Sequence, residues 1–446
     1  MPEVKPDDGQ TPPLAGALAP GQSYLQFLAA AARRADVVCL DAKRQRYLVA
    51  HPDGIKHILL DNHQNYRQMT PARPLMGHRS LTMASGDAWR QRRRLMQPLF
   101  SPRRLTGLAP QLEQATDEML ARWQAPLAAG QSLDIAAEMI RLSLDGLIYA
   151  LFGAASESQG ELRRVVVAAF DYFEARQRRG WALPPFLPTP GNRRLQRALE
   201  ALRAGVRQRI AEHRRQAGES EPTDLLAMLL QAEDPQSGGR LSDEDLVDEL
   251  MMLLVMGHMT TAMALTWTFY LLALHPAADR RLYGELQNLG DRPAGADDLP
   301  GLVWLRAVVD EVLRLYPPTW SISRGANGPD VVSGYQIPAG AFILISSWVV
   351  HRRSDLWPAP EGFDPERFLG GRGEARHRFA YFPFGGGPRT CIASSFALLE
   401  IPLVVARVAR QLRLDLLPEQ PVRLRSTISL QPAFGLRMRL VARDTF

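Results

Sequence analysis

Apolar residues recur at helical spacing along most of the chain. Positions three and four residues apart predict helices over residues 23–34, 52–60, 111–123, 135–152, 160–177, 193–216, 225–232 and 302–315. Shorter alternating runs predict strands at 37–40, 46–50, 331–336 and 342–346, with a hairpin inside 426–440. We therefore expect a mainly α protein with a small β region near the N-terminus.

The longest apolar stretch covers residues 250–274 and is long enough to span a membrane. Its centre, 257–261, is polar, and five carboxylates lie within 243–249 just before it. This pattern favours a helix buried through the centre of a soluble protein over a membrane span. We expect the helix to begin after Ser242, capped by its hydroxyl and by Asp245 three residues later.

Composition narrows the class of partner. The net charge of the 446 residues is +6, carried almost entirely by arginines spread along the predicted helices. Neither a basic run nor interleaved aromatic residues point to nucleic acid, so we expect a solvated basic surface that attracts an acidic protein. The only cysteines, Cys39 and Cys391, imply no disulfide framework and fit a reducing cytoplasm.

The first twenty residues contain five prolines and three acidic side chains. They lack a basic segment followed by an apolar core, so we expect a flexible arm rather than a signal peptide.

One stretch near the C-terminal end carries unusual chemistry. Residues 384–391 read Phe-Gly-Gly-Gly-Pro-Arg-Thr-Cys, and apolar positions at helical spacing follow them. Three glycines and a proline predict a tight loop, so Cys391 stands where a loop becomes a helix. The positive end of the helix dipole and Arg389 favour a thiolate there. Such a thiolate suits a haem iron ligand, whereas a structural thiol or a nucleophile without a paired histidine is the weaker interpretation.

This stretch resembles the cysteine loop of the cytochrome P450 family, with Ala393 where that family usually has glycine. Further motifs at 89–93, 256–261, 311–314 and 365–368 follow in the family's order. The resemblance implies the cytochrome P450 fold as a single domain over residues 21–446. It also implies haem b, lying between the long central helix and the helix after the cysteine loop.

The resemblance assigns roles residue by residue. It makes the Cys391 thiolate the axial ligand of the haem iron, and five further residues haem contacts: Trp89, Arg93, Arg324, Phe384 and Arg389. It implies a buried, structural charge network of Glu311, Arg314 and Arg367. It implies a substrate pocket that includes Met83, Val255, Met256, Met259, Trp320, Ile322 and Phe434.

The central helix resembles the family's oxygen-activating segment, Ala/Gly-Gly-x-Asp/Glu-Thr-Thr/Ser. Gly257, Thr260 and Thr261 match it as catalytic positions, but Met259 replaces the acid and Met256 the small residue. His258 occupies the unspecified position, and we expect it to be partly exposed. Protons must then come through the two threonines and ordered water, with His258 as a further candidate.

By resemblance, the enzyme inserts one oxygen atom of O2 into a lipophilic substrate such as a fatty acid or terpenoid. An apolar, proline-rich stretch at 181–190 would be its lid. Separate proteins, either ferredoxin with its reductase or a flavodoxin-type donor, would supply electrons to a monomer. Two alternatives stay open: an enzyme that uses peroxide or rearranges its substrate, and a haem-binding sensor without turnover.

Overall fold

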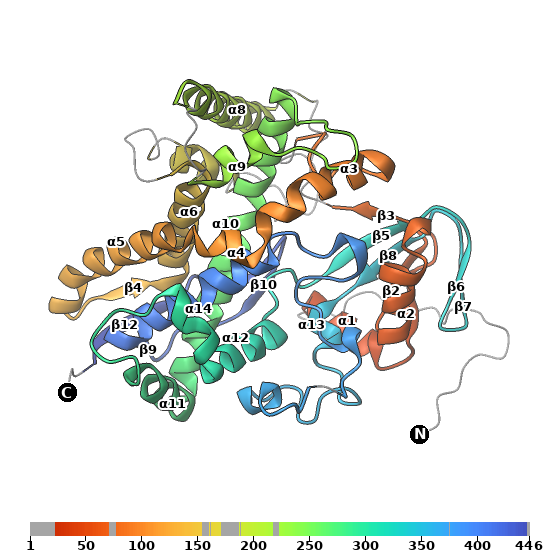
Figure 1. The fold of residues 1–446 in the computed structure, drawn as a ribbon. Helices are drawn as coiled ribbons and strands as arrows, with labels where there is room; N and C mark the ends of the chain where they lie inside the picture. Colours follow the sequence, from red (N-terminus) through yellow and green to blue (C-terminus); the bar gives the residue numbers. More distant parts are fainter. Residues whose placement is uncertain are drawn as a thin grey trace. The chain divides into compact units, whose positions relative to one another are not determined.

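The computed structural model describes residues 23–70, 77–153, 160, 162–170, 187, 189–216, 223–373 and 375–443. The expected arm at 1–20 and most of the expected lid at 181–190 lie outside this range. The chain divides into two compact units that interleave along the sequence (Figure 1). Unit 1 comprises Met1–Thr70 and Asp310–Ile392, and unit 2 comprises Pro71–Val309 and Ala393–Phe446. The single-domain organisation stays a prediction.

Unit 1 is built around a five-stranded sheet. Its helices are α1 (Tyr24–Ala32), α2 (Pro52–Lys56), which continues as a π-helical turn (His57–Asp61), and α13 (Ser347–Val350). Its strands are β1 (Val37–Asp41), β2 (Arg46–Val49), β3 (Tyr66–Met69), β5 (Ile322–Ala326), β6 (Asp330–Val332), β7 (Tyr335–Ile337) and β8 (Phe342–Ile345). The strand order in the sheet is β1-β2-β8-β5-β3, in which only the β2–β8 pair is parallel.

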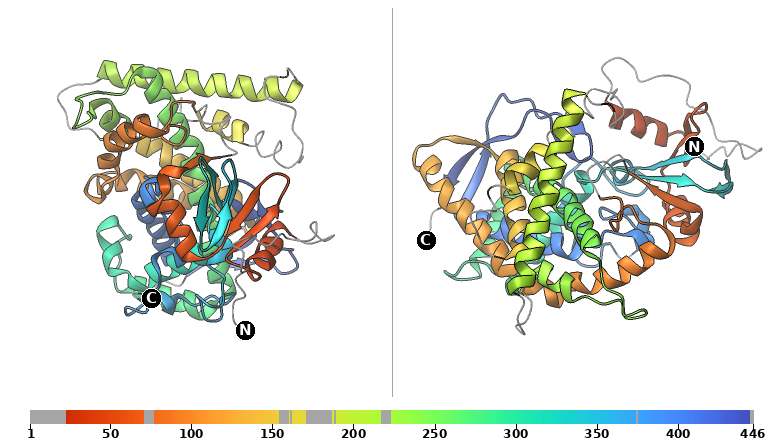
Figure 2. Two further views of the ribbon diagram at one scale, coloured as in Figure 1. Left: turned by 90° about the vertical axis from the view of Figure 1, so that its right-hand side faces the viewer. Right: turned by 90° about the horizontal axis from the view of Figure 1, so that it is seen from above.

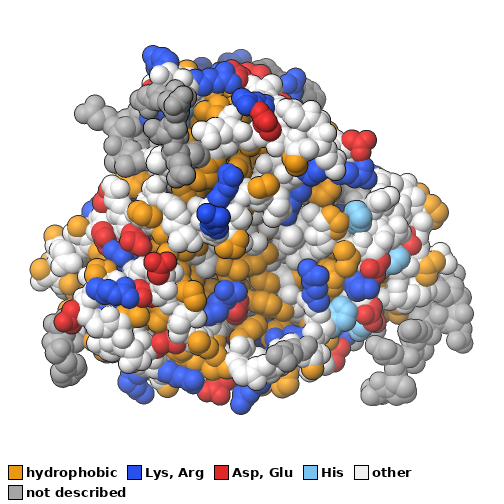
Figure 3. All heavy atoms as spheres, viewed as in Figure 1, with side chains coloured by type: hydrophobic (Ala, Val, Ile, Leu, Met, Phe, Trp, Pro, Cys, Tyr) orange, Lys and Arg blue, Asp and Glu red, His pale blue; other side chains and the backbone are white. Residues whose placement is uncertain are grey.

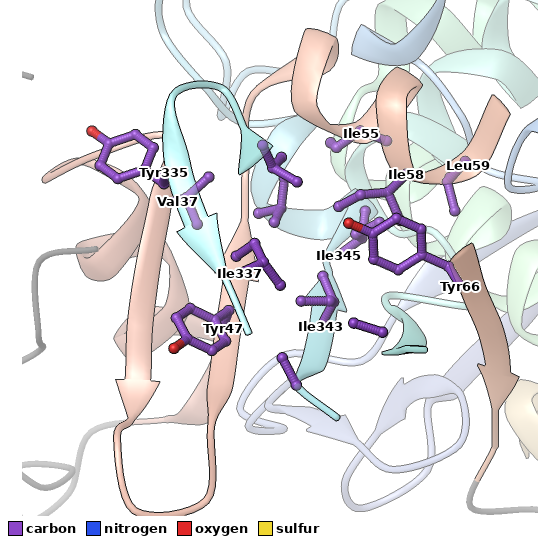
Figure 4. Close-up of a cluster of buried hydrophobic side chains, with 14 of the residues drawn as sticks. Val37, Tyr47, Ile55, Ile58, Leu59, Tyr66, Tyr335, Ile337, Ile343 and Ile345 are labelled. Atoms are coloured by element: carbon purple, nitrogen blue, oxygen red, sulfur yellow. The ribbon is translucent and has the colours of Figure 1, made fainter. Parts of the chain in front are cut away.

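The core of unit 1 follows from strand alternation. Every second residue of β1, β2 and β8 turns to the same side, which places Val37, Tyr47 and Ile343 in one buried cluster (Figure 4). Ile55 and Ile58 close this cluster from the helical segment. The apolar face expected for residues 52–60 is thus confirmed.

Unit 2 is mainly helical. Its α-helices are α3 (Gly86–Met96), α4 (Pro102–Thr106), α5 (Ala109–Ala128), α6 (Ile135–Phe152), α8 (Pro190–Gln216), α9 (Leu225–Gln231), α10 (Asp243–Leu274), α11 (Pro276–Gln287) and α14 (Ser394–Gln411). Helix α12 (Val303–Leu315) runs from unit 2 into unit 1 along the chain. The strands of unit 2 are β4 (Ser132–Asp134), β9 (Leu412–Leu416), β10 (Leu424–Ser426), β11 (Leu430–Pro432) and β12 (Arg437–Ala442).

Helix α10 is the centre of unit 2, and α6, α8 and α14 pack against it (Figure 2). Its N-terminus is a capping box in which Ser242 and Asp245 satisfy each other's main-chain N–H groups, as expected. The helix is long and apolar enough to cross a membrane, but 83% of its most apolar 18-residue window is buried inside the protein. It therefore serves as a core helix of this unit.

Three local expectations were wrong. Residues 331–336 are not one strand: β6 and β7 form a tight hairpin, whose turn holds Ser333 and Gly334 at φ of 50° and 84°. The terminal hairpin is β10 with β11, whereas β12 pairs with β4 and β9. The sequence makes Asp87 a plausible cap of α3, but Asp87 is the second residue of that helix and Ser85 occupies the cap position.

A buried charge network joins α12 to the loops of unit 1. The Glu311 carboxylate lies 2.7 Å from the Arg314 Nε atom, 3.4 Å from the Arg367 Nε atom and 2.8 Å from the Asp364 N–H. Glu311 and Arg314 are both fully buried. Arg314 also donates to the carbonyls of His351, Pro360 and Gly362. The network therefore fixes the path of the chain after residue 350.

We expect Glu311→Ala to destabilise the protein by about 3–5 kcal/mol, because it leaves the buried Arg314 charge without its partner. Chemical denaturation and the yield of haem-loaded protein measure the loss. Glu233→Ala is the matched control, because Glu233 pairs with Arg240 on the surface, where the two side chains are 51% and 62% exposed. If the two variants unfold at the same denaturant concentration, the network does not hold these loops.

Candidate functional site

The loop before Cys391 is fixed by main-chain hydrogen bonds and by glycine. The N–H of Cys391 donates to the Phe384 carbonyl over 2.9 Å. Gly387 has φ of 68°, and a Cβ atom there would lie 1.8 Å from the Leu59 carbonyl oxygen. A Cβ on Gly386 would meet the Phe379 ring at 2.4 Å. Only glycine fits these two positions, as the sequence led us to expect.

This loop presents an exposed thiol. Cys391 is exposed, Cys39 is buried, and neither forms a disulfide. Within the part of the chain that the structure describes, no group of three His, Cys, Asp or Glu side chains could hold a metal ion. Among these described residues, Cys391 therefore has no partners for a zinc-type ligand cluster. It lies three residues before the start of α14.

Two arginines of unit 1 bring positive charges together. Arg324 of β5 is 7% exposed, and its guanidinium donates to the Ser323 carbonyl. Burial, and then repulsion from Arg389, lowers the pKa of Arg324 to about 10. Burial also lowers the pKa of Arg389, which contacts Gln68. Among the described residues, Arg324 has no carboxylate partner, although an uncompensated buried charge is costly.

The chemistry of this pair fits a doubly anionic group. The two carboxylates of a haem would supply the counter-charge that Arg324 lacks, and the planar forks of arginine suit carboxylates. Cys391 belongs to the same unit. The residues present therefore fit a haem-thiolate group.

In unit 2, α10 has one uncovered place. From Leu246 to Phe269 every residue is buried except Met256, Gly257 and Thr260, which we call the open face of α10. These positions lie at i, i+1 and i+4, so they adjoin on the helix surface. A Cβ on Gly257 would lie 2.9 Å from Leu147 of α6, so this glycine also allows close helix packing.

The two threonines differ in what they can do. The Thr260 hydroxyl donates to the Met256 carbonyl over 3.1 Å, and the Thr261 hydroxyl donates to the Gly257 carbonyl over 3.2 Å. Thr260 lies on the open face, whereas Thr261 is only 4% exposed. Thr260 is therefore the threonine that can meet a ligand.

The expectation that His258 is partly exposed was wrong. Its side chain is buried against the Phe170 ring, and its Nδ1 atom lies 2.6 Å from the Leu254 carbonyl oxygen. Burial lowers the pKa of His258 to about 4, so it is neutral near pH 7. Residues two apart do not share a helix face, so His258 points away from Thr260 and is a poor proton donor to it.

The remaining expected site residues fall in several places. Trp89 and Arg93 lie four apart on α3, and Met83 lies in the loop before that helix. Val255 and Met259 are buried in α10. In unit 1, Trp320 is buried edge-on to the Tyr24 ring, and Ile322 begins β5. Phe434 is 68% exposed.

Sequence reasoning missed several buried carboxyl groups, three of which lie on α10 and α14. Asp248 and Glu249 of α10 are 4% and 0% exposed, and Glu400 of α14 is 2% exposed. Burial raises the pKa of Glu400 to about 8, with Ser143 of α6 beside it. The available signal was an acid inside an apolar helical run, which calls for a partner.

Comparison with known proteins decides the family. The family model described as cytochrome P450 matches residues 23–435. The chain belongs to the cytochrome P450 family. It is accordingly a P450 monooxygenase, an oxidoreductase with a haem-thiolate cofactor.

Three similar proteins illustrate the relationship. Cyclooctat-9-en-7-ol 5-monooxygenase of Streptomyces melanosporofaciens is 35% identical over 92% of this chain and 89% of its own length. Pentalenene oxygenase of Streptomyces avermitilis is 31% identical over 94% of this chain and 93% of its own length. The crystal structure of the cytochrome P450DA haem domain aligns with a TM-score of 0.87 at 25% identity, covering 98% of both chains. The P450 fold expected from the sequence is confirmed.

Glu400 gives this P450 a specific pH dependence. Its pKa is raised in the folded protein from 4.5 to about 8, so the fold favours its protonated form. The resulting stability is complete below about pH 4.5 and is lost as the pH rises to 8. We expect Glu400→Gln to remove this loss, which amounts to at most about 1.4 kcal/mol per pH unit.

Denaturation midpoints between pH 5 and pH 8.5 measure this effect. Glu233→Gln is the control, because Glu233 is half exposed and pairs with Arg240 on the surface. Parallel pH profiles for the wild type and Glu400→Gln would show that Glu400 is charged throughout.

Proposed function

We propose that this P450 inserts one oxygen atom of O2 into a lipophilic terpenoid, with haem b held by the Cys391 thiolate. The observation that carries the proposal is the exposed Cys391 in the same unit as the buried, uncompensated Arg324 guanidinium. A haem with a thiolate ligand supplies activation of dioxygen by favouring cleavage of the O–O bond. The names of the two relatives above point to terpenoid oxidation.

Within this proposal the chain's own residues have distinct tasks. Arg324 and Arg389, joined by Trp89 and Arg93, would bind the haem propionates. Phe384 would pack beside the cofactor at the start of the cysteine loop. Thr260 would hold water on the open face of α10 through its hydroxyl, whose donor bond to the Met256 carbonyl leaves its lone pairs available.

The substrate contacts are proposed from the positions that match the pocket residues of the family. Met83, Val255, Met256 and Met259 of unit 2, with Trp320 and Ile322 of unit 1 and the exposed Phe434, would bind an apolar molecule. Methionine suits irregular ligands, because its thioether side chain is flexible and polarisable. Gly257 would keep α10 close to α6, and Thr261 would support Thr260.

Electrons are proposed to come from a ferredoxin with its reductase or from a flavodoxin-type donor. The P450 itself is proposed to be a cytoplasmic monomer. The net charge of +6 favours an acidic donor. On the face shown in Figure 3, Lys and Arg side chains are interspersed with Asp and Glu. On that face the local arrangement of individual charged side chains, rather than one large basic patch, would therefore orient the donor protein.

The proposed ligand is tested by Cys391→Ser. We expect the reduced carbon monoxide complex of the wild type to show a thiolate-type Soret band, and this band to disappear in the variant. Cys39→Ser is the control, because Cys39 is buried in the unit 1 core and should leave the band in place. A thiolate-type band that persists in Cys391→Ser excludes Cys391 as the ligand.

Met259 is the second residue to test. A thioether carries no transferable proton, and the neutral, buried His258 does not replace the missing acid. We expect much of the reducing power of NAD(P)H to be lost as peroxide. Met259→Glu should then raise the ratio of product formed to NAD(P)H consumed.

Met259→Gln separates acidity from shape, because the amide is similar in size but supplies no acidic proton. It should leave the ratio unchanged, and released peroxide should fall only in Met259→Glu. A tightly coupled wild type that gains nothing from Met259→Glu would show that another group delivers the protons. The same missing acid favours a second candidate function, oxidation with peroxide, which product formed from peroxide without any donor protein would support.

A further inference from the structure

The loop of residues 77–84, here called the anchor loop, is held on α10 by two carboxylates. The Arg79 N–H donates to Asp248 Oδ2 over 3.0 Å, and the Leu81 N–H donates to Glu249 Oε2 over 2.9 Å. The approach is close, because a Cβ on Gly77 would lie 1.9 Å from the Asp248 Cγ atom. Both carboxylates are buried. Fixed side chains of α10 therefore determine where the main chain of this loop runs.

Arginines from two other helices compensate these charges. Arg92 of α3 donates to Glu249 Oε1 over 3.2 Å and to Asp245 Oδ1 over 2.6 Å. Arg203 of α8 pairs with Asp248. Each buried carboxylate thus uses one oxygen for an arginine and the other for the anchor loop, so both contacts depend on the same side chain.

The anchor loop meets α10 on the side where the open face lies. Glu249, Met256 and Thr260 occupy positions i, i+7 and i+11, which point in nearly the same direction on an α-helix. Seven residues separate Glu249 from Met256, which corresponds to about 10 Å along the axis. The bond between Leu81 and Glu249 therefore lies on the same side of α10 as the open face, about two helical turns before it.

We propose that Glu249, together with Asp248, is a positioning residue that sets substrate specificity by holding the anchor loop as the wall of the substrate space beside the open face of α10. This inference rests on the proposed function, since it gives the open face to the substrate. It assigns Glu249 no contact with the reacting atoms. Glu249 acts through the anchor loop.

The charge of Glu249 makes this positioning depend on pH. Burial raises the pKa of Glu249 to about 7, against the opposing effects of the Leu81 N–H from the loop and Arg92 from α3. Asp245 on the same helix raises it slightly further. The charged form accepts stronger hydrogen bonds, so the loop should loosen as the pH falls through 7. The fold itself should not lose stability there, because burial favours protonated Glu249.

Hydrogen exchange of the holoenzyme tests the positioning directly. In Glu249→Leu, the amides of the anchor loop should exchange about tenfold faster, as expected for the loss of one charge-assisted hydrogen bond. Glu249→Gln resembles protonated Glu249: it keeps an uncharged acceptor, so its loop protection should be intermediate and should match that of the wild type at pH 6. Asp243→Asn is the control, because Asp243 lies in the exposed first turn of the same helix and pairs with Arg214 on the surface.

Two azoles that bind ferric haem report the effect on the substrate space. The affinity for the bulky clotrimazole should change at least about fivefold in Glu249→Leu, whereas that for the small imidazole should stay within about twofold. Wild-type selectivity between the two should change between pH 6 and pH 8, and Glu249→Gln should remove this change. If Glu249→Leu does not fold, the pH profiles of the wild type and Glu249→Gln decide the question.

Unchanged loop exchange in a folded Glu249→Leu, or azole selectivity that does not respond to Glu249→Gln, would overturn the positioning role. Failure of the proposed function looks different. A wild type without a thiolate-type Soret band would refute the haem assignment, while the exchange experiment would still decide whether Glu249 holds the loop.

Discussion

The constraint on which the rest depends is the close approach of two main-chain segments at Gly387. A Cβ on residue 387 would lie only 1.8 Å from the Leu59 carbonyl oxygen, so no other residue type fits there without moving the π-helical turn that contains Leu59. That turn is itself held by Ile58 and Leu59 in the unit 1 core. The core therefore fixes the loop, and the loop fixes where the Cys391 thiol is presented. A reactive group is positioned more precisely when rigid residues that take no part in the chemistry support it.

The second feature of the structure is that three ionisable side chains are buried, at a cost in free energy. Arg324 is buried beside another arginine, Glu400 is buried without a cation among the described residues, and Glu249 is buried in an apolar helix. Only Glu249 has a full set of partners, and these lead to the main chain of a loop. The three cases require different explanations: a missing anionic group, a neutral acid, and a positioning device.

Much of this could be predicted from the sequence where chemistry needs a fixed spacing. Glycine and cysteine in one short loop, an acid and arginines around α12, and apolar periodicity each specify their own local structure. Glu311, Arg314 and Arg367 meet because α12 places the first two one turn apart. The family comparison then confirmed the fold that these motifs had indicated.

The rest depends on contacts between distant segments, which local pattern does not encode. Ser333 adopts a positive φ within an apparently continuous strand because Gly334 follows it in a tight turn. His258 is buried because Phe170, almost ninety residues earlier, covers it. Nothing near Glu249 in the sequence indicates that its partner is the Leu81 N–H. Such features become visible only when the partners are seen together.

The central claim is that the Cys391 sulfur binds the haem iron. Iron K-edge X-ray absorption of the purified ferric holoenzyme tests it directly, since sulfur scatters differently from nitrogen and oxygen at the axial position. The account predicts one sulfur ligand in the wild type and the same sulfur ligand in Cys39→Ser. A first coordination sphere made only of nitrogen and oxygen would contradict it.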